Sequence, residues 1–497
     1  MLLTVLLFLP LAVAVALLAL PAAVARRAAW WAWTAAATAE TALVVVVWAG
    51  HEPGGGVQYE ARTRWIPSAG VGYHVGVDGL SLPLLAVTCV LFLACAAYSR
   101  RETRRIREYA ALFLFLQTAC LGVFAALDLI LFFVFFDLSI VGMYVVVAGW
   151  GRRPAAARAA LAFFLYTFLG SLALLLGFIG LYVAAEPHTF DMTELTDRPP
   201  LQGRSWHAAL VLLAIGLGLA IKTPTVPFHT WLPPAHTEAP AAGSAILAGI
   251  LLKMGTYGFL RIAMPMLPEA WRRFALVFVV LGVVSVLYGA LVALAQRDVK
   301  RMIAYTSVNH MGYVLLAVGA AATAGERAGR LAVDGAVTQM VSHALITGAL
   351  FLLAGVLYDR GRSHAMADWS GLAGPAPVFA ALTGVAAFAS LGLPGFSGFV
   401  AEFQVFAGSL SARPFATGLA LLGVLLTAGL FLRALHRILL GPPRLPAGVR
   451  AFPDLRAHEA AAIVPLLALA VLLGVAPRFL LDVVEPAARE LVGLVAR

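Results

Sequence analysis

The chain has 497 residues, of which 62% are apolar and only 12% are charged. A water-soluble domain carries roughly 25% charged residues, so this composition excludes an ordinary soluble protein. The net charge of +10 does not indicate nucleic-acid binding, because the arginines are spread over short loops and form no single basic face. The three cysteines, Cys89, Cys95 and Cys120, lie in apolar runs without the spacing of zinc or iron–sulfur sites.

Apolar runs recur along the whole chain, and each is long enough to cross about 30 Å of hydrocarbon. No basic residue precedes the first run, whereas Arg26 and Arg27 follow it, so we expect a retained span rather than a cleaved signal peptide. The fold class we predict is an all-α polytopic membrane protein with about fourteen transmembrane helices. The predicted spans lie near residues 2–24, 29–49, 79–98, 109–127, 129–149, 160–184, 207–227, 243–266, 274–294, 301–320, 333–357, 377–407, 415–436 and 458–480.

The loops between these spans indicate an orientation. If the first span ends inside the cell, more than half of the 35 basic residues fall in inner loops, which agrees with the positive-inside rule. These loops include residues 100–107 with their five arginines, Arg152 and Arg153, residues 297–301 and residues 433–456. We therefore expect a multi-pass inner-membrane protein with both termini outside.

Two of the spans are interrupted. The seventh runs into Pro224 and Pro227, and the twelfth contains Pro394 between glycines. Proline removes a backbone donor, and broken helices at matching positions of two halves are typical of inverted-repeat transporters. We therefore predict two inverted five-helix repeats, spans 4–8 and 9–13. The expected division is an N-terminal part (1–104), the two repeats (105–270 and 271–445) and a C-terminal part (446–497).

Six ionisable residues fall inside or beside the predicted spans. A charge at the bilayer centre costs at least about 2.5 kcal/mol, so such residues are expected to be functional. The set combines two acids with four bases, which indicates a series of stations for protons. The candidate proton-transfer residues are Asp137, Lys222, Lys253, His310, His343 and Glu402.

The use of lysine is informative because only three of the 35 basic residues are lysines: Lys222, Lys253 and Lys300. Two of them are predicted to lie in the membrane. A buried lysine can release its proton, whereas arginine cannot at any usable pH. A purely structural ion pair would accept arginine at these positions, so the lysines favour proton transfer.

Other polar positions have simpler interpretations. His229 and His236 follow the seventh span, where they cap or pair locally or else line a route for proton uptake. Glu40 lies midway along the second span and is interpreted as a helix–helix contact. Asp128 lies at a tight turn, and Arg261 is close enough to a helix end to extend to the interface.

Residues 220–240 (AIKTPTVPFHTWLPPAHTEAP) and 248–259 (AGILLKMGTYGF) carry a specific motif. They resemble the signature of the antiporter-like M chain of bacterial NADH–quinone oxidoreductase, respiratory complex I, which is called chain 4 in mitochondria. Residues 297–307, and residues 395–399 with Glu402, look like further parts of that pattern. The resemblance covers about residues 75–440.

The resemblance implies fourteen helices with two inverted five-helix repeats, and proton translocation driven by NADH oxidation and quinone reduction elsewhere. It matches Lys222 to the family's broken-helix lysine and Lys253 to its central lysine, and His310, His343 and Glu402 to the following polar positions. It implies no cofactor in this chain, with FMN and iron–sulfur clusters in partner subunits. The implied partners are neighbouring antiporter-like chains, lipid, the hydrophilic redox arm and a subunit that binds quinone.

One departure from the family concerns the fifth span, where the family usually has glutamate followed by a Leu-Ile-Pro stretch. This chain has Asp137, followed by residues 139–143 (SIVGM). Aspartate keeps the charge but is one methylene shorter. The resemblance therefore implies weaker or water-bridged coupling between Asp137 and Lys222.

Three alternatives remain. A subunit of a multisubunit Na⁺/H⁺ antiporter or of a membrane-bound hydrogenase shares the fold, although residues 229–236 (HTWLPPAH) favour complex I. A solute transporter needs selective polar groups around a cavity, and the sequence offers protonatable groups. A structural scaffold is disfavoured because six buried ionisable groups are costly.

Overall fold

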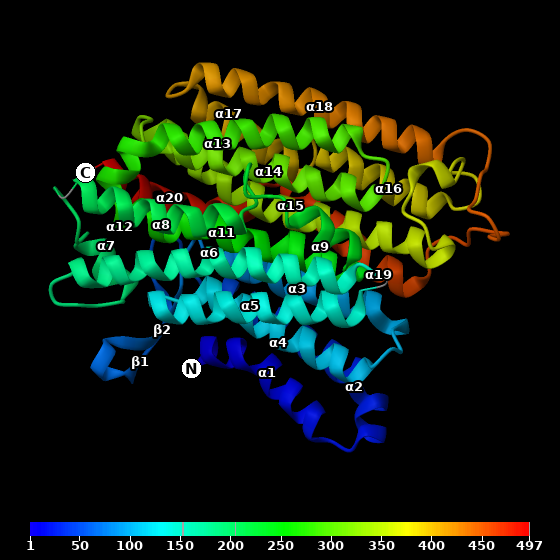
Figure 1. Ribbon diagram of the computed structural model, residues 1–497, viewed down its shortest axis with the longest axis horizontal. Coiled ribbons are helices and arrows are strands. Elements are labelled where there is room, and N and C mark those ends of the chain that lie inside the picture. The colour runs from blue at the N-terminus through cyan, green and yellow to red at the C-terminus, as the bar shows by residue number, and fades with distance from the viewer. Residues whose placement is uncertain (152–153, 204, 497) are drawn as a thin grey trace.

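The computed structural model describes residues 1–151, 154–203 and 205–496. Most helices run along the longest axis of the molecule, with α1 and α2 at one edge and α18 at the opposite edge (Figure 1). Among the described residues, eleven helical segments are long and apolar enough to cross a membrane. They are α1 (Leu2–Ala19), α2 (Ala22–Ala49), α3 (Leu82–Tyr98, extended by a 3-10 turn), α4 (Ile106–Ala125), α5 (Leu129–Trp150), α6 (Ala156–Ala184), the composite segment Ala241–Met266, α13 (Pro268–Ala295), α15 (Glu326–Gly361), α18 (Pro414–Leu439) and α19 (Ala457–Val475).

The predicted all-α membrane fold is confirmed, and each predicted span contains at least one helix. The remaining helices are α7 (Met192–Asp197), α8 (Ser205–Lys222), α9 (Leu232–Glu238), α14 (Val299–Ala321), α16 (Pro377–Ser390), α17 (Ser397–Leu410) and α20 (Arg478–Ala496). The count of fourteen spans, the inverted repeats and the four-part division of the chain stay predictions.

Both predicted interruptions are present. Helix α8 ends at Lys222 and α9 begins at Leu232, while α16 ends at Ser390 and α17 begins at Ser397. Backbone donors freed at the first interruption find new partners, since Val226 N–H donates to Ser285 Oγ of α13 at 2.9 Å. Irregular backbone at membrane depth is tolerated where neighbouring helices satisfy it in this way.

The eighth predicted span differs from the expected plain helix. It consists of α10 (Ala241–Ile246), a π-helical segment (Leu247–Leu251), α11 (Leu252–Gly258), a second π-helical segment (Phe259–Ala263) and α12 (Met264–Met266). Lys253 lies in α11, between the two π-helical segments. A π-helical segment inserts an extra residue into a turn and often marks a functional site. Apolar periodicity cannot reveal such an insertion.

A β-hairpin and helix α20 were not predicted. Strands β1 (Gln58–Ile66) and β2 (Val71–Val77) follow α2 and precede α3 in the chain, and they pair antiparallel. Helix α20 follows α19 and buries one side, with residues such as Val484, Ala488 and Leu491 at helical spacing. The hairpin and the C-terminus lie at the same end of the molecule (Figure 1). We call this the hairpin end.

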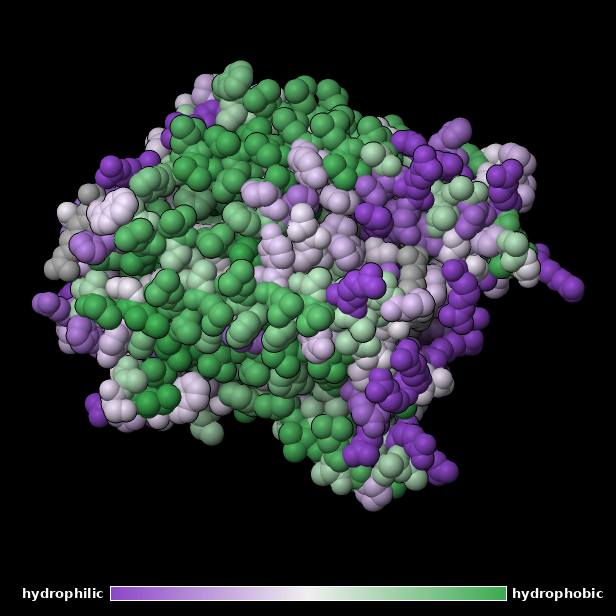
Figure 2. Space-filling view, in the orientation of Figure 1, coloured by the Kyte–Doolittle hydropathy of each residue, from purple (hydrophilic) through white to green (hydrophobic). Residues whose placement is uncertain are grey.

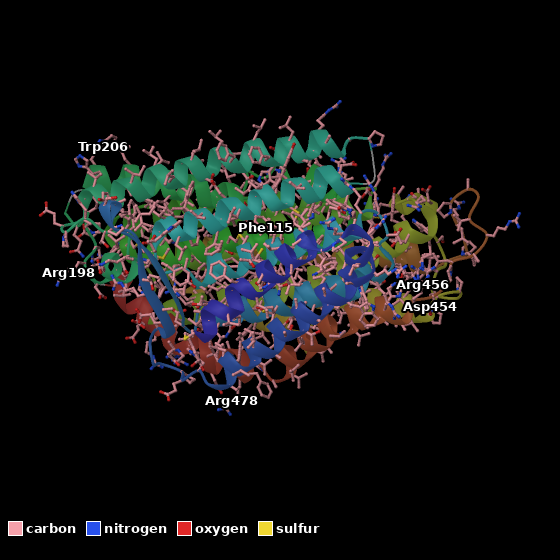
Figure 3. The ribbon with its side chains drawn as sticks, turned by 90° about the horizontal axis from the view of Figure 1, so that it is seen from below. Phe115, Arg198, Trp206, Asp454, Arg456 and Arg478 are labelled. Carbon is pink, nitrogen blue, oxygen red and sulfur yellow. The ribbon has the colours of Figure 1, made fainter. Side chains whose placement is uncertain are left out.

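The surface has an apolar band between two polar ends, as Figure 2 shows, with the larger hydrophilic area opposite the hairpin end. This arginine-rich end contains residues 100–107, 297–301, 360–362 and 433–456, and Figure 3 labels Asp454 and Arg456 there. Arg152 and Arg153, also expected in an inner loop, lie outside the described residues. The charge asymmetry agrees with a multi-pass membrane protein, and the position of the termini relative to the cell stays a prediction.

Buried charged contacts hold the helices together at the arginine-rich end. The guanidinium of Arg360, at the end of α15, donates to both carboxylate oxygens of Glu459 on α19 at 2.5 and 2.6 Å. Both side chains are only 3% exposed. Asp454 accepts hydrogen bonds from the backbone N–H groups of Val378 and Phe379 at 2.9 and 2.8 Å. It therefore caps the first turn of α16 from a distant loop.

Candidate functional site

The ammonium group of Lys253 lies in the interior of the helix bundle and is inaccessible to solvent. Its Nζ lies 2.5 Å from Nδ1 of His343 on α15 and donates to the carbonyl of Ala248 at 2.7 Å. Ala248 belongs to the π-helical segment before α11, so the irregular backbone supplies one of the two partners of the lysine. This pair joins two helices that are far apart in the sequence.

Beyond His343, the polar side chains continue toward the second broken helix. The ring centres of His343 and His310 are 5.4 Å apart, and Nε2 of His343 has no hydrogen-bond partner among the described residues. Nε2 of His310 lies 3.2 Å from the carbonyl of Ser390, at the end of α16, and 4.0 Å from Oε1 of Glu402. Four of the six predicted residues thus form one row.

The second interruption makes room for the carboxylate of Glu402. Gly392, in the turn between α16 and α17, has a φ of +73°. A Cβ added to this glycine would lie 2.4 Å from Oε2 of Glu402. Both the backbone conformation and the close approach therefore require glycine here.

Lys222 and Asp137 form a second, less direct group. Nζ of Lys222 donates to Ser139 Oγ at 3.2 Å and lies 4.4 Å from the ring centre of Phe136. Asp137 is partly exposed, its Oδ1 has no hydrogen-bond partner among the described residues, and no ion pair within 4.0 Å joins it to Lys222 in that part of the chain. Ser139, two residues after Asp137, is thus the side chain that Lys222 contacts directly.

Ser139 also connects the two lysine-bearing segments. Besides contacting Lys222, its hydroxyl lies 3.4 Å from Sδ of Met254, the residue after Lys253. Helices α8 and α11 pack closely there, because a Cβ on Gly255 would lie 2.4 Å from Thr223 Oγ1. The two lysines are therefore carried by adjoining segments of the bundle.

Lys300 is not among the residues predicted to form the site, and His236 was expected either to cap or pair locally or to line a route for proton uptake. The ammonium of Lys300 is buried and donates to the carbonyl of Ala239 at 2.6 Å. His236 is fully buried, stacks on Phe351 at 4.5 Å, and lies within electrostatic reach of both Lys253 and Lys300. One sequence signal could have identified Lys300: it is one of only three lysines in the chain, and all the other Lys and Arg residues are arginines.

Cavities approach this region from the arginine-rich end. A small cavity is lined by Glu238, Lys300, Tyr358 and His364. A larger one of about 520 Å³ shares Tyr358 and Ala241 with it and is otherwise lined by polar and charged loop residues, Arg101, Arg362 and Arg456 among them. Polar side chains therefore extend from the arginine-rich surface toward Lys253.

Of the other polar positions, Asp128 caps α5 by accepting hydrogen bonds from the N–H groups of Ile130 and Leu131. Arg261 does not simply extend to the interface as expected. It forms an ion pair with Asp78 at 2.6 Å, and its Nε donates to the Tyr257 hydroxyl at 2.8 Å. Burial opposes the charge of Asp78, but the facing guanidinium lowers the pKa of this carboxyl below its usual value.

The fold and the buried lysines define a class of membrane subunits. The family model described as "NADH:quinone oxidoreductase/Mrp antiporter, TM" matches residues 126–427, more than half of the chain. Among the described residues, no group of three or more His, Cys, Asp or Glu side chains is arranged to hold a metal ion.

Similar proteins narrow this class. NADH-quinone oxidoreductase subunit M of Rickettsia conorii is 40% identical over 86% of this chain and 84% of its own length, and that of Rhodobacter capsulatus is 39% identical over 99% and 96%. Subunit M of Escherichia coli is 37% identical over 86% and 83%. This chain belongs to the family of NADH–quinone oxidoreductase subunit M.

Solved structures agree with this assignment. A chain of respiratory complex I from Thermus thermophilus superposes with a TM-score of 0.89 at 30% identity, with complete coverage of both chains. A chain of the Mrp complex from Dietzia has a TM-score of 0.86 at 24% identity and covers 100% and 99% of the two chains. The second likeness concerns the fold alone.

Proposed function

We propose that this chain translocates protons as a membrane subunit of an NADH–quinone oxidoreductase in the bacterial inner membrane. NADH oxidation and quinone reduction take place in partner subunits, which hold the FMN and iron–sulfur clusters of the respiratory chain. The family membership supports this role. The observation that carries it is the contact of 2.5 Å between Lys253 Nζ and His343 Nδ1 inside the bundle.

The row from Lys253 to Glu402 gives the proton a route with one acceptor at each step. The ammonium of Lys253 donates a proton to Nδ1 of neutral His343, and the imidazolium releases one from Nε2 toward His310. His310, whose Nε2 faces the carboxylate of Glu402 at 4.0 Å, passes a proton to that carboxylate. Histidine suits this task because it can receive a proton on one ring nitrogen and release it from the other.

Uptake takes place from the arginine-rich end. The larger cavity brings water near Tyr358 and Ala241, and Lys300 and His236 lie between this region and Lys253. His236 has two buried nitrogens without hydrogen-bond partners among the described residues. The imidazole of His236 therefore connects Lys300 to Lys253. The two termini lie on the opposite, outer side of the membrane.

Asp137 and Lys222 control the other half of the subunit. A carboxylate near a buried lysine favours its charged form, and loss of that influence favours release of the proton. Because no direct ion pair joins Asp137 to Lys222, Ser139 mediates part of this coupling. Conformational and electrostatic changes in the neighbouring antiporter-like chains of the membrane arm supply the driving force.

The experiment uses the intact complex in proteoliposomes. NADH-driven proton uptake is measured for the wild type and Lys253→Met, with NADH–ferricyanide activity as the control for an assembled redox arm. We expect loss of pumping with the control activity retained, and normal pumping would reject the proposal.

The Mrp-like fold makes an antiporter subunit the second candidate. Co-purification with short antiporter subunits, and without flavin, would favour that alternative.

A further inference from the structure

The cavity of about 520 Å³ at the arginine-rich end brings together arginines from three separate parts of the chain. Arg101 and Arg104 lie in the segment between α3 and α4, Arg362 directly follows α15, and Arg456 directly precedes α19 (Figure 3). His458, which also lines the cavity, lies within electrostatic reach of both Arg101 and Arg456. Guanidinium groups that are far apart in the sequence therefore meet around one hollow.

These arginines differ from others at the same end, whose guanidinium groups have partners within the chain. Arg105 donates to a backbone carbonyl at 2.7 Å, and Arg433 donates to another at 2.8 Å. In the part of the chain that the structure describes, three arginines of the cavity form no ion pair and no side-chain hydrogen bond: Arg101, Arg104 and Arg362. Their N–H donors are exposed and directed at no acceptor of this chain, so they are available to a ligand.

The acidic residues of the cavity do not neutralise these arginines. The lining carries four guanidinium groups and three carboxylates. One of the carboxylates, Glu459, is already paired with Arg360, which does not line the cavity. Asp359 accepts a hydrogen bond from the Tyr98 hydroxyl at 3.3 Å, and Glu102 accepts one from a backbone N–H of its own loop at 2.9 Å. The cavity therefore has an excess of positive charge, which favours an anion.

Aromatic residues of the lining indicate the depth of the cavity in the membrane. Tyr98 is the last residue of α3 and Trp150 is the last residue of α5. Tyrosine and tryptophan at the ends of spanning helices are enriched at the level of the lipid headgroups. Helices α5 and α19, which contribute to the lining, also carry exposed apolar side chains such as Val145 and Val464. The cavity thus lies at headgroup depth, beside helices that face hydrocarbon.

We propose that this cavity binds the phosphate group of an anionic phospholipid from the leaflet at the arginine-rich end. Guanidinium groups suit this ligand because paired N–H donors can contact two phosphate oxygens at once. Arg101, Arg104 and Arg362 supply these donors, and a basic recess between transmembrane helices is a recurrent site for lipid headgroups. The cavity volume falls within the range of about 300–1,000 Å³ that is usual for ligand sites. The binding itself does not depend on the proposed function.

The test is photo-crosslinking in the intact complex, reconstituted in phosphatidylcholine vesicles with a trace of photoactivatable phosphatidylglycerol. Peptide mass spectrometry should find the label at the ends of α3 and α19, which line the cavity. The double variant Arg101→Gln with Arg362→Gln should lower this labelling about tenfold or more, because each arginine near an anionic lipid contributes about fivefold to binding. The double variant Arg444→Gln with Arg450→Gln removes the same charge from an exposed loop at the same end and should label as the wild type does. Equal labelling of the two double variants would indicate unspecific attraction and overturn the proposal.

Competition experiments identify the source of the phosphate group. Excess unlabelled phosphatidylglycerol should abolish the labelling, whereas inorganic phosphate should leave it unchanged. Displacement by inorganic phosphate would assign the cavity to a free anion and overturn the lipid proposal. The replaced arginines have no partners in the described part of the chain, so the variants should assemble, and retained NADH–ferricyanide activity of the purified complex verifies this. The labelling does not depend on pumping, so its failure is distinguishable from a failure of Lys253→Met in the pumping assay.

Discussion

Nζ of Lys253 lies 2.5 Å from Nδ1 of His343, although the two residues are 90 positions apart in the chain. Two bases can share such a contact only if at least one of them is uncharged, because two buried positive charges at this distance repel each other strongly. The contact therefore constrains the pair to carry at most one extra proton. A proton on either residue is within transfer distance of the other.

Replacing His343 with glutamine should interrupt this transfer. Glutamine keeps the size and polarity of the side chain but cannot accept a proton from Lys253. General acid–base groups typically contribute about 10²-fold or more to the rates of the steps they assist, so NADH-driven proton uptake by this route should fall to a small fraction. Thr347→Val, one turn further along α15 and also buried, is the matched control and should pump normally. Equal pumping by His343→Gln and wild type would contradict the role of this histidine.

Asp137 should act through its charge. Asp137→Asn removes the charge and should impair pumping, whereas Asp137→Glu keeps it and adds one methylene. Because Lys222 contacts Ser139 instead of Asp137, the longer side chain should not weaken the coupling and pumping should persist. The measurement is the initial rate of proton uptake per NADH oxidised in proteoliposomes. Normal uptake by Asp137→Asn would show that this acid has only a structural role.

The β-hairpin should loosen as the pH rises. His74 on β2 lies between Asp191 Oδ2 at 2.6 Å and Glu60 Oε1 at 2.8 Å. Burial opposes the charged imidazole, but the hydrogen bond and charge of Asp191 outweigh it and raise the pKa of His74 above its usual value. Burial likewise opposes the charge of Asp191, while the bonds from His74 and Thr193 lower the pKa of that carboxyl to about 2.

These directions define a pH window. The contribution of His74 is complete below its ordinary pKa of about 6.5 and is lost as the pH rises through the raised value. The contribution of Asp191 is present above about pH 4 and is lost as the pH falls toward 2. Hydrogen–deuterium exchange in residues 58–77, corrected for intrinsic rates, should therefore accelerate as the pH rises above the ordinary histidine pKa of about 6.5 and through the raised pKa of His74. His74→Gln should abolish this pH dependence, and constant protection in the wild type would refute it.

The buried pair between Arg360 and Glu459 should be important for stability. Removing one partner of a buried ion pair leaves an uncompensated charge and typically costs about 3–5 kcal/mol. Arg360→Met should therefore lower the thermal stability of the subunit, measured as its loss from the assembled complex on heating. The double variant Arg360→Met with Glu459→Leu should recover much of the loss. Arg362→Met, at a neighbouring but more exposed arginine, serves as the control, and an equal effect there would argue against the pair.

Much of this architecture follows from apolar run length and from proline and glycine. The interruptions after Lys222 and before Ser397 were predicted because proline cannot continue the backbone hydrogen bonding of a helix. The grouping of Lys253, His343, His310 and Glu402 was anticipated as a series, although the sequence contains no distances. These four side chains come from different helices and can meet only if those helices are neighbours, and the family resemblance matched them to one series of polar positions.

Other features could not be predicted. The π-helical segments around Lys253 leave the apolar pattern unchanged, so a plain helix was the natural expectation. Lys300 lies next to arginines in what reads as a loop, and it is tertiary packing that buries it, where its ammonium group donates to the carbonyl of Ala239. Arg261 was expected to extend toward the interface because its partner, Asp78, is 183 positions away. Pairing at such a separation depends on tertiary structure that no local pattern encodes.

The most direct test of the account is the proton-to-electron ratio of the intact complex carrying Lys253→Met, measured beside Lys222→Met and wild type. Methionine keeps most of the length and apolar volume of lysine but cannot hold a proton. The account predicts that both variants assemble, retain NADH–ferricyanide activity and pump little or not at all. A ratio equal to that of the wild type in the Lys253→Met complex would contradict the central claim that protons pass through this buried lysine.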